Sequence, residues 1–416
     1  MRTGNSKKGS TSVFLTMILA SILLVAALFI HAASVAAGRS CSDAVFELAG
    51  RSVLSEYDLE LQNRYGIFAV QTDGGKVEEK LRKYIDYSFH RNPLKEALRG
   101  RIYTDTLKLE LKSLRVSLKG YSITDVDLFE QQILEEMKYG IVKELLNEEH
   151  QPKSQTYRAI LRNEQIMNSL PSKGYQSGFI SDLKRIVENG IPSLAEIEKT
   201  AEDQFLTGEY IMSHFYNNRF GNETRDSFFS NEVEYILKGN LDDQINYNSV
   251  RNDLFLIRNV LNLIHIKKDP EKWSKVEGAA AALTLVKGKE IGAFLVAEAW
   301  AAAESENDLR LLEAGKKVTL IKGKDHWAVP ISSTLDYIWK EDYLTPAKDN
   351  GYDYEDYLRI LLFLENREKK LLRCMDLIQL NMKGIYNRDF DLRECYGGFQ
   401  FEAATWEGTF TYVQKF

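Results

Sequence analysis

The stretch VFLTMILASILLVAALFIHAASVAA, Val13–Ala37, is an uncharged run of 25 residues, and it decides the architecture of the chain. A helix rises about 1.5 Å per residue, so the run covers roughly 37 Å, and about 20 apolar residues suffice to cross a bilayer. Inside lipid a helix satisfies all of its own backbone hydrogen bonds. The sequence therefore predicts a transmembrane helix over residues 13–37.

Basic residues stand in front of this run. Arg2, Lys7 and Lys8 precede it, whereas Arg39 on the other side is soon followed by Asp43. Because positive charge tends to stay on the cytoplasmic side, residues 1–12 are predicted to be a cytoplasmic leader. The chain is then a single-pass protein of the cell membrane with its C-terminal part extracellular.

A cleavable secretory signal is the alternative to a permanent anchor. Small residues follow the apolar run, with Ala36, Ala37 and Gly38 in a layout that fits a signal peptidase site. The apolar part of such a signal is usually about 7 to 15 residues, shorter than this run. A largely apolar helical stripe also continues to about Gln62, which predicts an extracellular continuation of the helix over residues 38–64.

The composition is that of a globular chain with an acidic outer part. Of the 416 residues 27% are charged and 44% are hydrophobic, and the formal net charge is -6. The first 40 residues hold four of the 54 basic residues and none of the 60 acidic ones, which leaves 50 basic and 60 acidic residues beyond them. This acidic balance gives no reason to expect nucleic acid as a partner, whereas the apolar run predicts contact with membrane lipid.

Residues 65–416 carry both strand and helix patterns, which predicts an α+β domain with an antiparallel sheet and many helices. A helical insertion is expected over residues 150–225, where Pro171 and Pro192 interrupt helical periodicity. The predicted strands are Tyr65–Val70, Leu107–Leu118 with a bulge, Asn231–Asn240, Lys317–Lys322 and a closing hairpin after Phe390. The predicted helices are Val77–Phe89, Asp125–Asn147, Asn246–Ile266, the buried pair Ala279–Val286 and Ile291–Ala303, and Tyr354–Lys383.

Signatures of enzyme chemistry are missing from the sequence. Phosphate-binding glycine loops and a nucleophile elbow do not occur, and the six histidines are far apart, so no catalytic, cofactor or metal site is predicted. Asp325 and His326 beside Trp327 could belong to a site or to a plain loop. The segment Asp349–Asp356 could wrap a cation, although a turn followed by an Asp353 N-cap explains it without one.

The three cysteines and a group of tyrosines leave alternatives open. Cys374 and Cys395 could form a disulfide in an oxidising exterior or stay as buried thiols, and Cys41 could be a reactive thiol just outside the membrane. A tyrosine-rich stretch could serve an interface or line a partly buried helix edge. Its members are Tyr337, Tyr343, Tyr352, Tyr354 and Tyr357.

Several stretches taken together resemble a biochemically uncharacterised family of membrane-anchored Firmicute envelope proteins. They are GSTSVFL (Gly9–Leu15), AGRSVLSEYDLELQNRYGIFAV (Ala49–Val70), NEVEYILKGN (Asn231–Asn240), AEAWAAAESENDLRLLEAGK (Ala297–Lys316) with Trp327, and EDYLRILLFLENREKKLLRCMDLIQLN (Glu355–Asn381). The first 70 residues are similar to TadE/TadG-like minor pilins of tight-adherence pilus systems. That resemblance implies a leader cleaved between Gly9 and Ser10, and other pilus or envelope subunits as partners.

One position departs from the pilin pattern. Pilin-like leaders resemble Gly, then a short polar run, then Glu at the fifth position, and here Phe14 occupies that position. A permanently anchored accessory subunit therefore fits better than a polymerising one. We expect a non-enzymatic accessory or structural subunit of an envelope assembly; the alternatives are an extracellular enzyme, anchored or secreted, and a ligand-binding ectodomain.

Overall fold

The protein is described from a computed structural model of the full chain. The structure describes residues 8–90, 109–144, 200–218, 227–282, 289–323, 326–334, 343 and 351–416. The chain divides into two compact units. Unit 1 comprises Met1–Asn63, Ile67–Leu128 and Asp391–Phe416, and unit 2 comprises Arg64–Gly66 and Phe129–Phe390.

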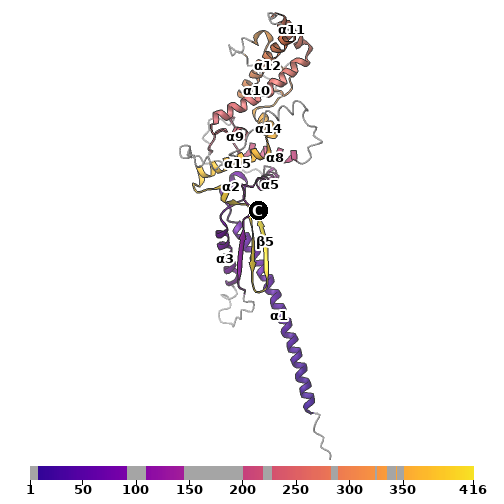
Figure 1. Ribbon diagram of the computed structural model, residues 1–416, viewed down its shortest axis with the longest axis vertical. Coiled ribbons are helices and arrows are strands. Elements are labelled where there is room, and N and C mark those ends of the chain that lie inside the picture. The colour runs from indigo at the N-terminus through magenta and orange to yellow at the C-terminus, as the bar shows by residue number, and fades with distance from the viewer. Residues whose placement is uncertain are drawn as a thin grey trace, which may run out of the picture. The chain divides into compact units, whose positions relative to one another are not determined.

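Unit 1 combines helices with two small antiparallel sheets (Figure 1), so the predicted α+β class is confirmed. The helices are α1 (Lys8–Leu54), α2 (Leu59–Tyr65, which ends in unit 2), α3 (Gly74–His90) and the 3-10 turn η6 (Leu392–Glu394). One sheet has the order β2-β4-β5, with β2 at Ser113–Ser117, β4 at Gly398–Ala404 and β5 at Thr409–Lys415. The other pairs β1 (Val70–Gln71) with β3 (Cys395–Tyr396).

The β4–β5 hairpin forms where the sequence predicts it, because apolar and polar residues alternate there. Phe399, Phe401 and Ala403 face the core, while the polar residues between them are exposed. The turn Thr405–Gly408 closes the hairpin, and Gly408 has a φ of 153°, which a glycine adopts without strain.

The core of unit 1 lies between the second half of α1, helix α3 and the three-stranded sheet. Phe46, Ala49 and Val53 of α1 are buried, and Val77, Leu81 and Ile85 of α3 meet them at four-residue spacing. About a third of α1 is therefore part of a folded core.

Unit 2 is a helical unit within the described residues. Its elements are α5 (Val126–Glu144, which begins in unit 1), α8 (Thr200–His214), α9 (Glu232–Lys238), α10 (Asp243–Lys268), α11 (Pro270–Ala282), α12 (Lys289–Glu313), the 3-10 turn η4 (Ile331–Ser333), α14 (Tyr354–Leu364), α15 (Arg367–Asn381) and the π-helical turn η5 (Met382–Tyr386). The helix pair predicted at Ala279–Val286 and Ile291–Ala303 is confirmed in part. Helix α12 contains the whole second range, although Phe294 and Leu295 within it are exposed, whereas α11 begins at Pro270 and residues 283–286 lie outside the described residues. Alanines such as Ala280, Ala297 and Ala301 pack with Trp300 in their shared core.

The long first helix is shorter than predicted beyond the apolar run. It ends at Leu54, and Asp58 then starts α2 by accepting a hydrogen bond from the backbone N–H of Leu61 at 3.0 Å. The strand predicted at Tyr65–Val70 was also wrong in extent. Gly66 has a φ of 64°, which interrupts extended backbone, and the strand β1 begins at Val70.

The segment NEVEYILKGN was predicted as a strand and is the helix α9. All six residues Glu232–Leu237 are buried, so no polar face marks a helical period. Gly239 ends the helix with a φ of 70°, and its N–H donates to the carbonyl of Tyr235 at 2.6 Å. The alternation of Glu232, Glu234 and their apolar neighbours, which suggested a strand, serves buried hydrogen bonds instead.

Two further predictions were wrong in detail. Lys317–Lys322 was predicted as a strand, but it forms one isolated β-bridge, between Val318 and Tyr352. The carbonyls of Thr319 and Leu320 accept hydrogen bonds from the Arg258 guanidinium instead of from a neighbouring strand. The single helix predicted at Tyr354–Lys383 is broken, since Asn366 caps α15 by accepting from the N–H of Lys369 at 3.1 Å.

Other predictions fall partly outside the described residues. Of the insertion predicted at 150–225, residues 200–218 are described, and there α8 packs against α14 within unit 2. In the strand predicted at Leu107–Leu118, residues 107 and 108 also lie outside the described residues. Glu110–Lys112 is not part of a strand, and the observed strand β2 begins at Ser113.

Candidate functional site

The surface of α1 is apolar on all sides over its first half. Its most apolar 18-residue window is entirely unburied, and among the described residues α1 is the one helix long and apolar enough to cross a membrane. The exposed large apolar side chains are Val13, Phe14, Leu15, Met17, Ile18, Leu19, Ile22, Leu23, Leu24, Val25, Leu28, Phe29, Ile30 and Val35. A helix that is apolar all round is stable when something other than water surrounds it.

The second half of α1 is tightly packed against the β4–β5 hairpin. A Cβ atom added at Gly38 would lie 3.0 Å from the Glu407 side chain, and one at Gly50 would lie 2.7 Å from that of Gln414. The Phe46 ring lies 5.3 Å from that of Phe410, centroid to centroid. Because α1 is unbroken between these two halves, the apolar segment joins the folded core without a linker.

Polar contacts also join α1 to the hairpin. The Tyr412 hydroxyl donates to the Asp43 carboxylate, and the Arg39 guanidinium lies 5.8 Å from the centre of the Phe410 ring. Burial and the hydrogen bond to Asp43 raise the pKa of Tyr412, so this hydroxyl stays protonated and remains a donor. These contacts orient the helix relative to the sheet.

The leader residues Gly9 and Ser10 lie in the first two turns of α1, which begins at Lys8. Their cleavage remains a prediction from resemblance.

The disulfide considered between Cys374 and Cys395 is not formed. Cys41, Cys374 and Cys395 are free thiols, and the last two are buried. Burial raises the pKa of both Cys374 and Cys395, which keeps them in the unreactive thiol form. Of the two alternatives that the sequence left open, the structure has buried thiols.

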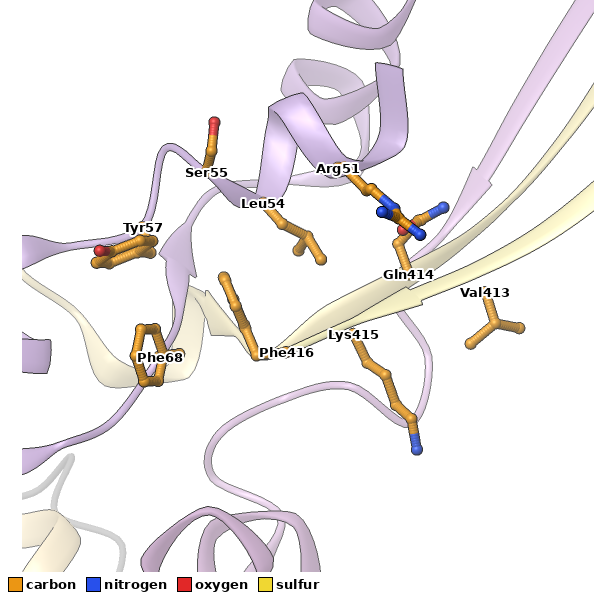
Figure 2. A pocket seen from close by; sticks show the side chains of 9 residues that line it. All are labelled: Arg51, Leu54, Ser55, Tyr57, Phe68, Val413, Gln414, Lys415 and Phe416. Carbon is orange, nitrogen blue, oxygen red and sulfur yellow. The ribbon is translucent and has the colours of Figure 1, made fainter. Parts of the chain in front are cut away.

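A pocket of about 450 Å³ lies in unit 1 beside the C-terminal end of β5, opposite the hairpin turn (Figure 2). Tyr57, Phe68 and Phe416 form an aromatic group on one side, with ring centroids 5.1 to 6.0 Å apart, and Arg51 and Lys415 supply positive charge on the other. No lining side chain is a carboxylate, histidine or thiol. The pocket can hold an apolar group, but its lining side chains offer no acid–base pair.

Unit 2 contains a buried ionic network that sequence reasoning missed. The Nε atom of Arg258 on α10 donates to the Asp308 carboxylate of α12 at 2.9 Å, and both side chains are fully buried. Lys322 forms ion pairs with Asp308 and with Glu304, which also accepts from the backbone N–H groups of Ala328 and Val329. The network connects α10 and α12 to residues 319–322 and 328–329.

A second buried polar group surrounds α9. Glu234 accepts from the Tyr354 hydroxyl at 2.7 Å and from the N–H of Asn218 at 3.0 Å. Burial raises the pKa of Glu234 to about 7, with the Asp243 charge adding to the rise. Glu232 accepts from the side chain of Asn381 at 2.6 Å and from the N–H of Tyr216 at 2.9 Å. The two carboxyl side chains of α9 thus provide hydrogen-bond acceptors for the backbone N–H groups of Tyr216 and Asn218.

The remaining sequence candidates show no assembled site. His326 accepts from the N–H of Gly323 at 3.2 Å, while Asp325 lies outside the described residues. Asp353 caps α14 in a capping box with Asp356, which confirms the N-cap interpretation of that loop. Of the tyrosines, Tyr354 and Tyr357 are buried and Tyr352 is exposed. Within the described ranges, no three His, Cys, Asp or Glu side chains are grouped to hold a metal ion.

These features define a class of protein, namely an α+β chain with a long exposed apolar helix at its N-terminal end. Residues 134–406 match the model of DUF5702, a family of unknown function, and the chain belongs to this family. The match begins within α5, so the apolar helix lies outside it. No curated protein and no solved structure matches the chain. These comparisons give no evidence for the similarity to tight-adherence pilins that the N-terminal residues suggested.

Proposed function

We propose that this protein is a single-pass membrane protein that presents units 1 and 2 outside the cell. It would act without catalysis, as an accessory or structural subunit of a cell-envelope assembly. One observation carries the proposal: the exposed apolar half of α1 continues without a break into the core of unit 1. The charge bias around the segment supports a cytoplasmic N-terminus.

The length of the apolar run favours retention of the helix over its removal as a signal peptide. The run has 25 residues, whereas the apolar part of a secretory signal usually has about 7 to 15. The helix is also continuous across Gly38 into the core of unit 1. Small residues such as Ala26, Ala33 and Ala37 also permit close approach of another membrane helix, which suits a subunit of an assembly.

The finer proposal is a subunit of a tight-adherence pilus or secretion assembly. It is supported by the resemblance of the N-terminal residues, and Phe14 in place of the pilin glutamate favours an accessory role. Partners would be other subunits of the assembly, through α1 in the membrane and through the outer units.

Mass spectrometry of the native N-terminus, combined with membrane fractionation, tests these proposals. A start at Met1 in carbonate-resistant membranes indicates a plain anchor, and a start at Ser10 indicates pilin-type processing. A start near Gly38 in the culture medium would refute the anchor. Protease added to intact cells should digest units 1 and 2, and their protection would refute the orientation.

A further inference from the structure

The β4–β5 hairpin runs beside α1 in a fixed register (Figure 1). Contacts between the two ascend together along both elements. They join Gly38 to Glu407, Arg39 to Phe410, Asp43 to Tyr412 and Gly50 to Gln414. The strand β5 therefore runs in the same direction as α1, and the hairpin turn Thr405–Gly408 lies level with Gly38.

Gly38 marks the end of the apolar segment. It directly follows Val13–Ala37, and Arg39 is the first charged residue after that run. When the run fills the hydrocarbon layer, the level of Gly38 is the layer of lipid headgroups. The hairpin turn then lies at the same depth, on the outer face of the bilayer.

The turn carries the residue types suited to that layer. Trp406 is 70% exposed, and the Lys112 ammonium lies 3.0 Å from the centre of its ring. Trp is enriched at membrane interfaces because its apolar ring and its polar N–H are both accommodated there. Lys112 places positive charge beside it, and Arg39 adds a second positive charge over the Phe410 ring, just past the turn. The one carboxylate in the turn, that of Glu407, packs against Gly38.

We infer that the turn of the β4–β5 hairpin is a second membrane contact, in which Trp406 inserts among the headgroups of the bilayer that α1 spans. Lys112 and Arg39 bind the phosphates of the phospholipids around it. This inference rests on the proposed membrane anchoring. It adds that unit 1 touches the membrane surface at two points, the helix and the turn.

Fluorescence quenching in nanodiscs tests the inference on the full chain. The bilayers contain phospholipid brominated either near the glycerol or near the chain ends, and the emission of Trp406 is obtained by subtracting the spectrum of Trp406→Phe. The other four tryptophans cancel in this difference. Shallow bromines should quench Trp406 several-fold more strongly than deep ones, and equal emission with and without bromine would overturn the inference.

A matched control moves the probe along the same hairpin. In a Trp406→Phe background, Val413→Trp places a tryptophan at a position that is 55% exposed on β5, about 13 Å beyond Thr409 at ~3.3 Å per residue. This probe should escape quenching. Quenching equal to that of Trp406 would indicate nonspecific adsorption and would also overturn the inference.

Carbonate extraction separates this failure from failure of the anchor. Retention in the membrane without quenching of Trp406 rejects the hairpin contact and leaves the anchor standing. Loss from the membrane under carbonate rejects both.

Discussion

Asp308 is the residue on which two buried cations of unit 2 converge. Arg258 and Lys322 both pair with its carboxylate, and Asn262 donates to it at 3.0 Å. Removing one partner from a buried ion pair leaves uncompensated charge and costs about 3 to 5 kcal/mol. We expect Asp308→Ala to lower the stability of unit 2 by that amount, measured by urea unfolding followed through Trp300 and Trp327.

An exposed ion pair of the same unit is the control. Lys275 pairs with Glu271 at 3.0 Å on α11, and their side chains are 54% and 62% exposed. Such pairs contribute less than about 1 kcal/mol, so Lys275→Ala should shift the unfolding midpoint little. Equal shifts in the two variants would show that the buried network does not stabilise unit 2.

Glu234 predicts a pH dependence of stability. Its pKa is raised from 4.5 to about 7 by burial, so between these values the folded protein keeps a proton that the unfolded chain has lost. Stability from this group is complete below pH 4.5 and falls as pH rises to about 7, by about 3 kcal/mol in total.

The variant Glu234→Gln isolates this effect. Its amide oxygen can still accept from Tyr354 and Asn218, but it cannot titrate. In urea unfolding across pH 4 to 8, the stability of the native protein relative to the variant should fall by about 3 kcal/mol. Parallel curves for the two proteins would contradict the raised pKa.

The buried network had one sequence signal that could have revealed it. Buried residues on α10 recur at intervals of four, at Asn246, Val250, Leu254, Arg258, Asn262 and Ile266. Charged and amide side chains within such a row indicate buried polar partners on a neighbouring helix. Those partners on α12, Ser305 and Asp308, are three residues apart and directly follow an alanine-rich stretch. The pairing itself depends on tertiary packing, which sequence periodicity does not encode.

At the scale of the element, α9 depends on its terminal glycine. Gly239 has a φ of 70°, and a Cβ atom there would lie 2.5 Å from the Arg373 guanidinium, which donates to the carbonyls of Ile236 and Lys238. We expect Gly239→Ala to destabilise unit 2 by more than about 1 kcal/mol, because left-handed backbone alone costs about 1 to 2. The check is the urea midpoint.

Gly278 offers the matched comparison. It lies inside α11, and a Cβ atom there would meet nothing within 4 Å. Gly278→Ala should therefore stabilise the protein by about 0.5 to 1 kcal/mol. The same sign for both variants would argue against the left-handed cap at α9.

The elements that could be predicted from the sequence are those whose hydrophobic residues repeat at a regular spacing and whose opposite face is exposed to solvent. Helices α3 and α10 and the β4–β5 hairpin are of this kind. The first half of α1 was predictable for another reason, namely the length of its uncharged apolar run. The observed structures of Asn231–Asn240 and Lys317–Lys322 could not be predicted from their hydrophobic patterns. In the first segment every face of the helix is buried, and in the second the Arg258 side chain of α10 donates hydrogen bonds to the backbone carbonyls.

At the scale of the whole molecule, the two halves of α1 have different roles, which truncation can separate. A chain starting at Gly38 loses the apolar segment and keeps Phe46, Ala49 and Val53, so it should be soluble with unit 1 folded. A chain starting at Ser55 loses these core side chains, each worth roughly 1 to 3 kcal/mol on burial, and unit 1 should not fold.

Circular dichroism and hydrogen exchange of the two truncated chains give the readout. Strong protection of β4 and β5 is expected in the longer chain and should be absent in the shorter one. Similar protection in both would show that α1 is dispensable to the core.

The continuity of α1 has a mechanical consequence if the helix spans the membrane as we propose. No flexible linker would then separate the bilayer from unit 1, because α1 runs unbroken through Gly38 to Leu54 and is held there by Phe46 and by the hydroxyl of Tyr412. In the anchored protein, a pull on unit 1 would be delivered straight to the membrane along the helix axis. Rotation of the membrane-spanning part of α1 about its axis would likewise rotate unit 1 by the same angle.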